Sequence, residues 1–186
     1  MPLSLDWNGA IAYLKRKLPE DGSPALQISG EDSPVLKDLK NGLLVSYIVD
    51  EGSRFTYVQN RHLRAAGIDE LTLHKTAVHN LYSVAEKHLK VQPYGPVFSV
   101  FMEGNFEASV LLLDTVWDVS FAQYVCEDFV AAIPARDVLA FGDSSSAEAI
   151  KELQAITDRA ISSSGDHAIS TSMYRRRNKL WTAYDN

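Results

Sequence analysis

The sequence V-F-S-V-F-M at residues 97–102, followed by F-V-A-A-I at 129–133 and V-L-A-F at 138–141, decides the fold. Each run has the length of a strand and is rich in branched and aromatic side chains, which favour β-structure. The last two runs are separated by P-A-R-D at 134–137, and proline and aspartate favour turns. The three runs predict adjacent strands, two of them joined as a hairpin.

The segment between these strands allows two interpretations. Residues 106–113 could form a returning strand. The helical spacing of five apolar residues instead favours a helix over about 109–125: Leu113, Val116, Trp117, Phe121 and Tyr124.

The N-terminal region predicts an appendage to the main domain. Trp7, Ile11, Leu14 and Leu18 share one face at helical spacing, which predicts a helix over 6–18 that Pro19 ends. Residues 20–34 are rich in proline, glycine, serine and acids, so we expect a loop with a short strand at 25–28. We expect residues 1–40 to form a helix-and-loop appendage and residues 41–186 the α+β domain.

Hairpins and helices then follow each other along the chain. Residues 43–49 and 55–58 predict two strands joined through 50–53, and a short helix at 61–66 ends at Gly67. The clearest helix spans 69–89, and Leu71, His74, Val78 and Leu81 lie on its apolar face.

The C-terminal part predicts another helix and a hairpin. Ser145 and Glu148 form a possible capping box. It opens a helix with an apolar face, and residues 173–184 predict a hairpin that turns near Arg177 and Asn178. The fold class is therefore α+β, an antiparallel or mixed sheet of hairpin-paired strands packed against helices.

Composition and charge limit the classes of partner that the protein could bind. Of 186 residues, 46% are hydrophobic, and 18 Lys and Arg against 24 Asp and Glu give a net charge of −6, which disfavours nucleic acid. Only Arg175–Arg176–Arg177 with Lys179 resembles a basic patch for nucleic acid, and a cluster of this kind near a C-terminus is typical of a solvated turn. One cysteine, no signal-peptide pattern and no apolar run of membrane-spanning length predict a cytoplasmic protein without a membrane partner.

The familiar catalytic and cofactor motifs do not occur. His74, His79 and His88 lie on different sides of their helix, and there is no H-E-x-x-H, C-x-x-C, G-x-S-x-G or phosphate-binding loop. We therefore expect no metal, no cofactor and no catalytic residue. His74 is expected to be half-buried and satisfied, and Cys126, followed by two acids, to be a buried or semi-buried structural thiol.

Four polar residues at strand ends are the binding candidates. Glu103 and Glu107 flank the Gly104–Asn105 turn, and Arg136 and Asp137 lie between two strands. The glutamates could bind a cation or end a strand, and the Arg–Asp pair could bind an anion or hold the turn; the structural alternative is favoured for both. Asp114 and Asp118, one helical turn apart, are expected on a solvated face.

Several short motifs resemble the YtpQ-like family of uncharacterised bacterial proteins. They lie within residues 42–141: a strand ending at Asp50, A-V-H-N-L at 77–81, F-E-A-S at 106–109 and P-A-R-D-V-L at 134–139. The resemblance implies little about function, because the family has no established activity and supplies no catalytic residues.

Two hypotheses about function follow. The first is a non-enzymatic cytoplasmic protein that binds another protein, one version being an immunity-type protein whose acidic surface neutralises a basic toxin. The second is a small hydrolase or ligand-binding enzyme that uses Glu103, Glu107 and Asp137 around a cleft, with or without a divalent cation. The two differ in whether these carboxylates converge.

Overall fold

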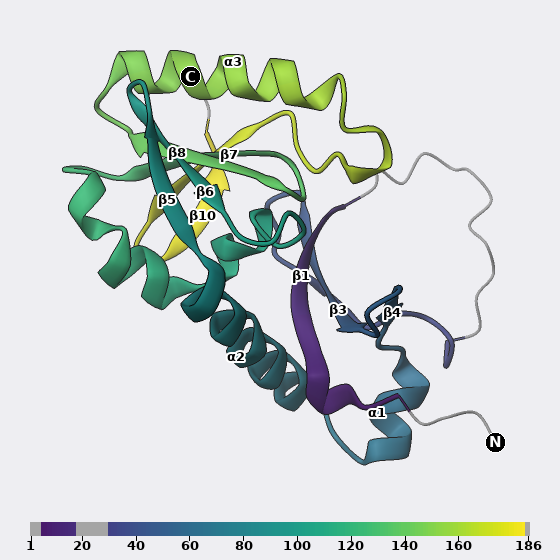
Figure 1. Ribbon diagram of the computed structural model, residues 1–186. Coiled ribbons are helices and arrows are strands. Elements are labelled where there is room, and N and C mark those ends of the chain that lie inside the picture. The colour runs from purple at the N-terminus through teal and green to yellow at the C-terminus, as the bar shows by residue number, and fades with distance from the viewer. Residues whose placement is uncertain (1–4, 18–29, 185–186) are drawn as a thin grey trace. The chain divides into compact units, whose positions relative to one another are not determined.

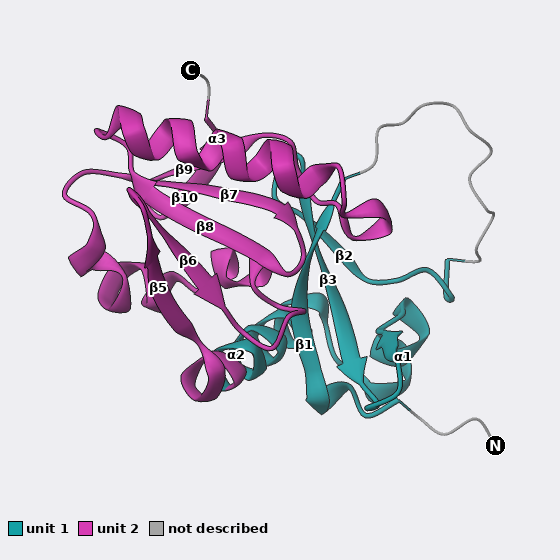
Figure 2. Cartoon of the chain, turned by 45° about the horizontal axis from the view of Figure 1, so that its top comes forward, with its two compact units in different colours: residues 1–83 teal, residues 84–186 magenta. Residues whose placement is uncertain are grey.

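The chain forms two compact units, Met1–Ser83 and Val84–Asn186 (Figure 2). The structure is a computed structural model that describes residues 5–17 and 30–184. Each unit contains an antiparallel sheet, so the predicted α+β class is confirmed (Figure 1). The boundary predicted at residue 40 lies inside the first unit. In the described ranges, no helix combines the length and the apolarity that crossing a membrane requires.

The sheet of the first unit is built around β3 (Leu43–Asp50). On one side β3 pairs with β1 (Ala10–Arg16), and it also pairs with the short strands β2 (Leu36–Asp38) and β4 (Phe55–Tyr57). The predicted strands at 43–49 and 55–58 and their hairpin are therefore confirmed, whereas the three-residue β2 was not predicted.

The predicted helix over 6–18 is wrong. A short 3-10 turn, η1 (Trp7–Gly9), leads into β1, whose seven residues all pair with β3. The physical reason is that residues 10–14 form a continuous apolar run, A-I-A-Y-L, in which Ala10, Ala12 and Leu14 are completely buried. The strand predicted at 25–28 lies outside the described residues.

Two helices of the first part of the chain are confirmed. Helix α1 (Asn60–Ala66) ends at Gly67, whose φ of +67° is the left-handed conformation that glycine adopts without strain. Helix α2 (Glu70–His88) buries a face slightly rotated from the predicted one: Leu73, Ala77 and Leu81 are fully buried, whereas Leu71 is 57% exposed.

The second unit contains a six-stranded antiparallel sheet in the order β10-β9-β7-β8-β6-β5. The predicted strands and hairpins are confirmed, and the sheet adds β5, which was not predicted because it contains a proline. The bounds are β5 (Lys90–Tyr94), β6 (Val97–Phe101), β7 (Phe129–Ala135), β8 (Val138–Asp143), β9 (Met173–Arg177) and β10 (Leu180–Ala183).

One face of this sheet packs against α3 (Ala147–Ile161), which lies along the top of the unit in Figure 1. The interface uses small and branched side chains, among them Val130, Ala132 and Leu153. At Gly142 the helix comes so close that an added Cβ would lie 2.9 Å from the Cβ of Ala149. The helix is capped by Ser146, whose hydroxyl accepts from the Ala149 amide, one residue later than predicted.

The other face carries an aromatic core centred on Trp117. Its ring contacts Phe121, Phe129, Phe141 and Trp181 at centroid distances of 4.8–5.3 Å. The predicted continuous helix over 109–125 is instead a series of short turns, η2 (Ala108–Leu112), η3 (Val116–Ser120) and η4 (Ala122–Tyr124). Because the breaks let the chain fold around Trp117, several aromatic rings reach one centre on the sheet.

Candidate functional site

Glu107 is a buried carboxylate that holds the turn after β6. Its side chain is 3% exposed, and Oε1 accepts hydrogen bonds from the amides of Met102 (2.7 Å) and Gly104 (2.8 Å). The turn contains two left-handed residues, Glu103 (φ +58°) and Gly104 (φ +76°). Oε2 has no hydrogen-bond partner among the described residues. Glu107 therefore stabilises the backbone of this turn, and its side chain does not face an open site.

The other candidates form no metal-ligand cluster with Glu107 among the residues that the structure describes. Glu103 lies 3.2 Å from Nε2 of His88, and its side chain is 43% exposed. The carbonyl of Arg136 accepts a hydrogen bond from the amide of Ala108, which follows Glu107 in the chain. The β7–β8 turn therefore lies beside this part of the chain. Asp137 is exposed. Within residues 5–17 and 30–184, no three His, Cys, Asp or Glu side chains are arranged to hold a metal ion.

Asp114 and Asp118 bind a buried arginine instead of lying on a purely solvated face. Arg176 is 7% exposed, and its two terminal nitrogens lie 2.8 Å from Asp114 and 2.7 Å from Asp118. Lys179 approaches Asp118 to 3.0 Å. Hydrogen bonds from Arg176 and Lys179 hold the pKa of the Asp118 carboxyl below its usual value.

The remaining arginines of the basic cluster are also paired. Arg175 and Arg177 approach Asp128 to 2.8 and 2.6 Å. The hydrogen bond from Arg177 lowers the pKa of Asp128 most. Burial raises this pKa, the hydrogen bond from Arg175 lowers it further, and the net result is a pKa below the usual value. Arg175 also donates to the Ser144 hydroxyl at 3.3 Å. All four cations of this cluster therefore have carboxylate partners within the protein, and it offers no unpaired basic patch.

Asp143 organises the loop before α3. Its carboxylate accepts hydrogen bonds from the amides of Cys126, Glu127 and Ser145 and from the Ser145 hydroxyl. Burial raises the pKa of Asp143, but these hydrogen bonds outweigh it and lower the pKa to about 2. Cys126 itself is exposed, so its predicted burial is wrong: the loop is fixed by the Cys126 amide, and the thiol is not needed for packing.

His74 is half-buried and hydrogen-bonded, as predicted. Its Nδ1 lies 3.1 Å from the Tyr47 hydroxyl and its Nε2 lies 3.0 Å from the Lys37 ammonium. Because the ammonium can only donate, Nε2 must accept and Nδ1 carries the proton. Burial and the Lys37 charge lower the pKa of His74. The three groups connect β2, β3 and α2 within the first unit.

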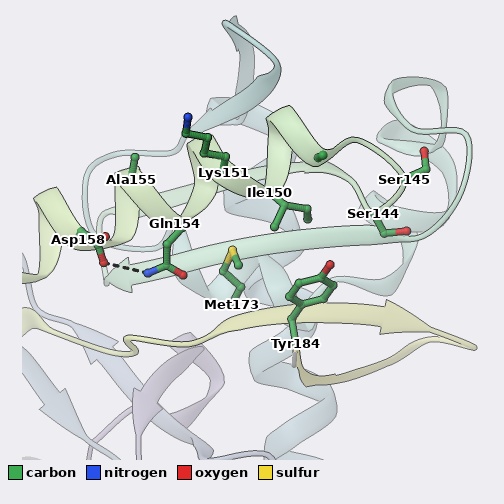
Figure 3. Close-up of a pocket in the computed structure, with 10 residues that line it drawn as sticks. Ser144, Ser145, Ile150, Lys151, Gln154, Ala155, Asp158, Met173 and Tyr184 are labelled. Carbon is green, nitrogen blue, oxygen red and sulfur yellow. Dashed lines mark hydrogen bonds between the residues drawn. The ribbon is translucent and has the colours of Figure 1, made fainter. Parts of the chain in front are cut away.

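A groove in the second unit runs along α3. It has a volume of about 700 Å³, within the usual range of ligand sites, and runs between α3 and the β9–β10 hairpin. Met173 and Tyr184 point up toward the helix, and Ile150 points down toward them (Figure 3). The remaining lining residues are Ser144, Ser145, Ala147, Lys151, Gln154, Ala155 and Asp158.

The polar groups of the groove do not form a catalytic arrangement. The Ser145 hydroxyl donates to Asp143, the Ser144 hydroxyl accepts from Arg175, and Gln154 donates to Asp158 at 2.9 Å. None of the lining residues is a histidine or cysteine. The apolar pattern of α3 does not indicate this groove, because positions 147, 151, 154, 155 and 158 of its lining lie on the flank of the helix and only Ile150 belongs to the apolar face.

Comparison of the chain with models of known protein families, with curated proteins and with solved structures finds no match. The resemblance to YtpQ-like proteins therefore stays a prediction.

Proposed function

We propose that this protein acts without catalysis, in the cytoplasm, by binding another protein in the groove between α3 and the β9–β10 hairpin. The observation that carries the proposal is the groove itself, an apolar floor of Ile150, Met173 and Tyr184 with a polar rim. Interfaces combine an apolar centre with a polar rim in this way. Nucleic acid is not a favoured partner, because the basic cluster on β9 is already paired with carboxylates.

The competing enzyme hypothesis has weaker support. It needs Glu103, Glu107 and Asp137 around one cleft, but the Glu107 carboxylate is buried and bound to two backbone amides. Neither Glu107 nor Asp137 lines the groove. Glu107, which this hypothesis places in the cleft, is therefore not accessible for acid–base catalysis or for cation binding.

Affinity capture from native lysate tests the proposal. We expect the wild-type chain to retain a stoichiometric protein partner and the Ala155→Arg variant to lose it, because an arginine side chain would fill the groove. Val119→Arg is the matched control, since Val119 is 71% exposed on η3, outside the groove. Recovery of bare protein, or equal capture by the Ala155→Arg variant, would contradict the proposal.

A metal titration tests the alternative. Mg²⁺, Mn²⁺ or Ca²⁺ at millimolar concentration should leave the melting temperature unchanged, because a ligand raises stability only when it binds the folded state. A rise that disappears in a Glu107→Gln variant would favour the carboxylate enzyme instead.

A further inference from the structure

The groove lies beside a sheet edge. Within the described residues, β10 is the last strand of its sheet and pairs only with β9. The Tyr184 amide donates to the Met173 carbonyl at 2.8 Å. In an antiparallel ladder, hydrogen-bonded and non-hydrogen-bonded pairs alternate. The N–H and C=O of Ala183, one residue earlier, therefore point away from β9 and outward from the sheet.

The side chains of the hairpin show which face an added strand would use. Met173 and Tyr184 are on the groove face. Because strand side chains alternate, Leu180 and Thr182 lie on that face too, and Leu180 is 69% exposed. A strand laid beside β10 would direct every second side chain toward the groove.

The length of the groove suits an extended segment. Its α3 lining spans positions 147 to 158 in two adjacent rows at i, i+4 and i+8 spacing. Eleven helical steps correspond to about 16 Å. An extended chain covers that distance in about five residues. Two or three of those side chains would enter the groove.

Two charges on the α3 flank indicate the chemistry of the occupant. Neither Lys151 nor Asp158 forms an ion pair with a described residue, and they lie seven positions apart on the helix. This spacing corresponds to about 10 Å, or about three extended residues. A complementary segment carries an acidic side chain for Lys151 and a basic one for Asp158. A second copy of β10, with the sequence L-W-T-A, has neither charge.

We infer that an extended segment of a partner protein adds to the Ala183 edge of β10 as a seventh strand of the sheet. Its apolar side chains contact Ile150, Met173 and Tyr184, and its acidic and basic side chains face Lys151 and Asp158. Backbone hydrogen bonds supply affinity and the groove supplies selectivity, as in other cases of strand addition. This inference rests on the proposed function and specifies the kind of partner.

A phage-displayed library of random seven-residue peptides, selected on the full-length protein, provides the probe. We expect enriched sequences in which apolar residues alternate with other residues and an acid and a base stand two to four residues apart. Failure to enrich any sequence, or enrichment of proline-rich or helix-forming sequences, would overturn the inference.

Substitution of Ala183 tests the backbone contact. Ala183→Pro removes the outward N–H and should weaken binding of a synthesised selected peptide at least tenfold, as measured by fluorescence anisotropy. Ala183→Val keeps the N–H and should bind as the wild type does. Because the outward N–H takes no part in pairing with β9, thermal unfolding of the proline variant should match that of the wild type. Equal affinity of both variants would overturn strand addition.

Two further arms separate the inference from the proposed function. N-methylation of the peptide at alternate residues, which leaves the protein unchanged, should abolish binding in one register only; tolerance at every position would overturn strand addition.

If Ala155→Arg abolishes peptide binding while Ala183→Pro does not, the groove binds protein by another geometry. If neither variant has an effect, the proposed function at this groove fails as well. A wild-type dimer dissociated by Ala183→Pro would assign the edge to a second copy.

Discussion

The two edges of the six-stranded sheet are protected to different degrees. At one edge, β5 has the sequence K-V-Q-P-Y, in which Pro93 has no N–H and Lys90 is exposed. At the other, β10 has the sequence L-W-T-A, without proline or charge. Prolines and lysines on edge strands prevent pairing with other chains. The difference indicates that one edge is closed to strand addition while the other is open.

The hairpins at these edges are also anchored differently. The β9–β10 hairpin is held by a buried cation, Arg176, between Asp114 and Asp118. The β5–β6 hairpin leads into a turn that is held by the buried carboxyl group of Glu107, which accepts hydrogen bonds from backbone amides. The first anchor depends on partner charges, whereas the second depends on backbone geometry. We therefore expect an uncharged replacement of Arg176 to be tolerated better than the loss of its carboxylates. At Glu107 we expect a replacement that keeps the acceptor oxygen to be tolerated better than one that removes it.

The largest effect is expected at the Arg176 anchor. The double variant Asp114→Ala and Asp118→Ala leaves a buried guanidinium without its carboxylates, which costs about 3–5 kcal/mol of unfolding free energy. Replacement of the cation itself, Arg176→Met, removes the charge and keeps an apolar side chain of similar length, so it should cost much less. Urea denaturation measures both. Equal losses would show that the network contributes packing rather than charge compensation.

A smaller effect is expected at the Glu107 anchor. Glu107→Ala removes the acceptor of the Met102 and Gly104 amides and should cost about 1–3 kcal/mol, the penalty for an unsatisfied buried group. Glu107→Gln keeps an acceptor oxygen for both amides.

The glutamine variant decides what Glu107 does. Because Oε2 has no partner among the described residues, the loss of that oxygen should cost little, and urea denaturation should place this variant within about 1 kcal/mol of the wild type. A loss as large as that of Glu107→Ala would show that the negative charge itself is needed, which would favour a bound cation.

The sequence could predict the fold wherever local pattern and tertiary environment agree. Hairpins such as β7–β8 and β9–β10 have apolar strands around turn residues, and α2 has a long helical period. The pattern failed at β1, where a helical spacing of large residues coincided with a buried strand, and around Trp117, where packing of aromatic rings breaks the helix. Both errors have a tertiary cause that no local window contains.

The candidate site was less predictable than the fold. Glu107 could be singled out by its position in a turn, but its burial depends on the turn of the backbone at Glu103 and Gly104. The pairing of Arg176 with Asp114 and Asp118 joins residues about sixty positions apart, and no spacing rule indicates it. The groove along α3 arises only when the helix flank meets the C-terminal hairpin.

Acid should weaken the β10 end of the sheet. Ion pairs lower the pKa of Asp128 and Asp118, so their contribution is present above the ordinary value of 3.8 and is lost as pH falls through the lower folded-state value. Because exposed pairs are screened by solvent, we expect a loss of about 1 kcal/mol for each.

Thermal unfolding between pH 5 and pH 2 measures this loss. The Asp128→Asn variant should be less stable at pH 5 and should show a shallower decrease below pH 4. A wild-type curve that is parallel to that of the variant over the whole range would contradict the assigned role of Asp128.

The smallest effect on stability is expected from opening the closed edge. Pro93→Val restores an N–H at an outward position of β5 and should change the unfolding free energy by only about 0.4–1 kcal/mol, because proline mainly restricts the unfolded chain. Its main result should be self-association beyond that of the wild type, since an unprotected edge strand pairs with other chains. Sedimentation velocity at several concentrations measures it. Adding Ala183→Pro to Pro93→Val should leave this association intact if it occurs through β5. If the second proline abolishes self-association, the association occurs through β10, and Pro93 is not the residue that prevents it.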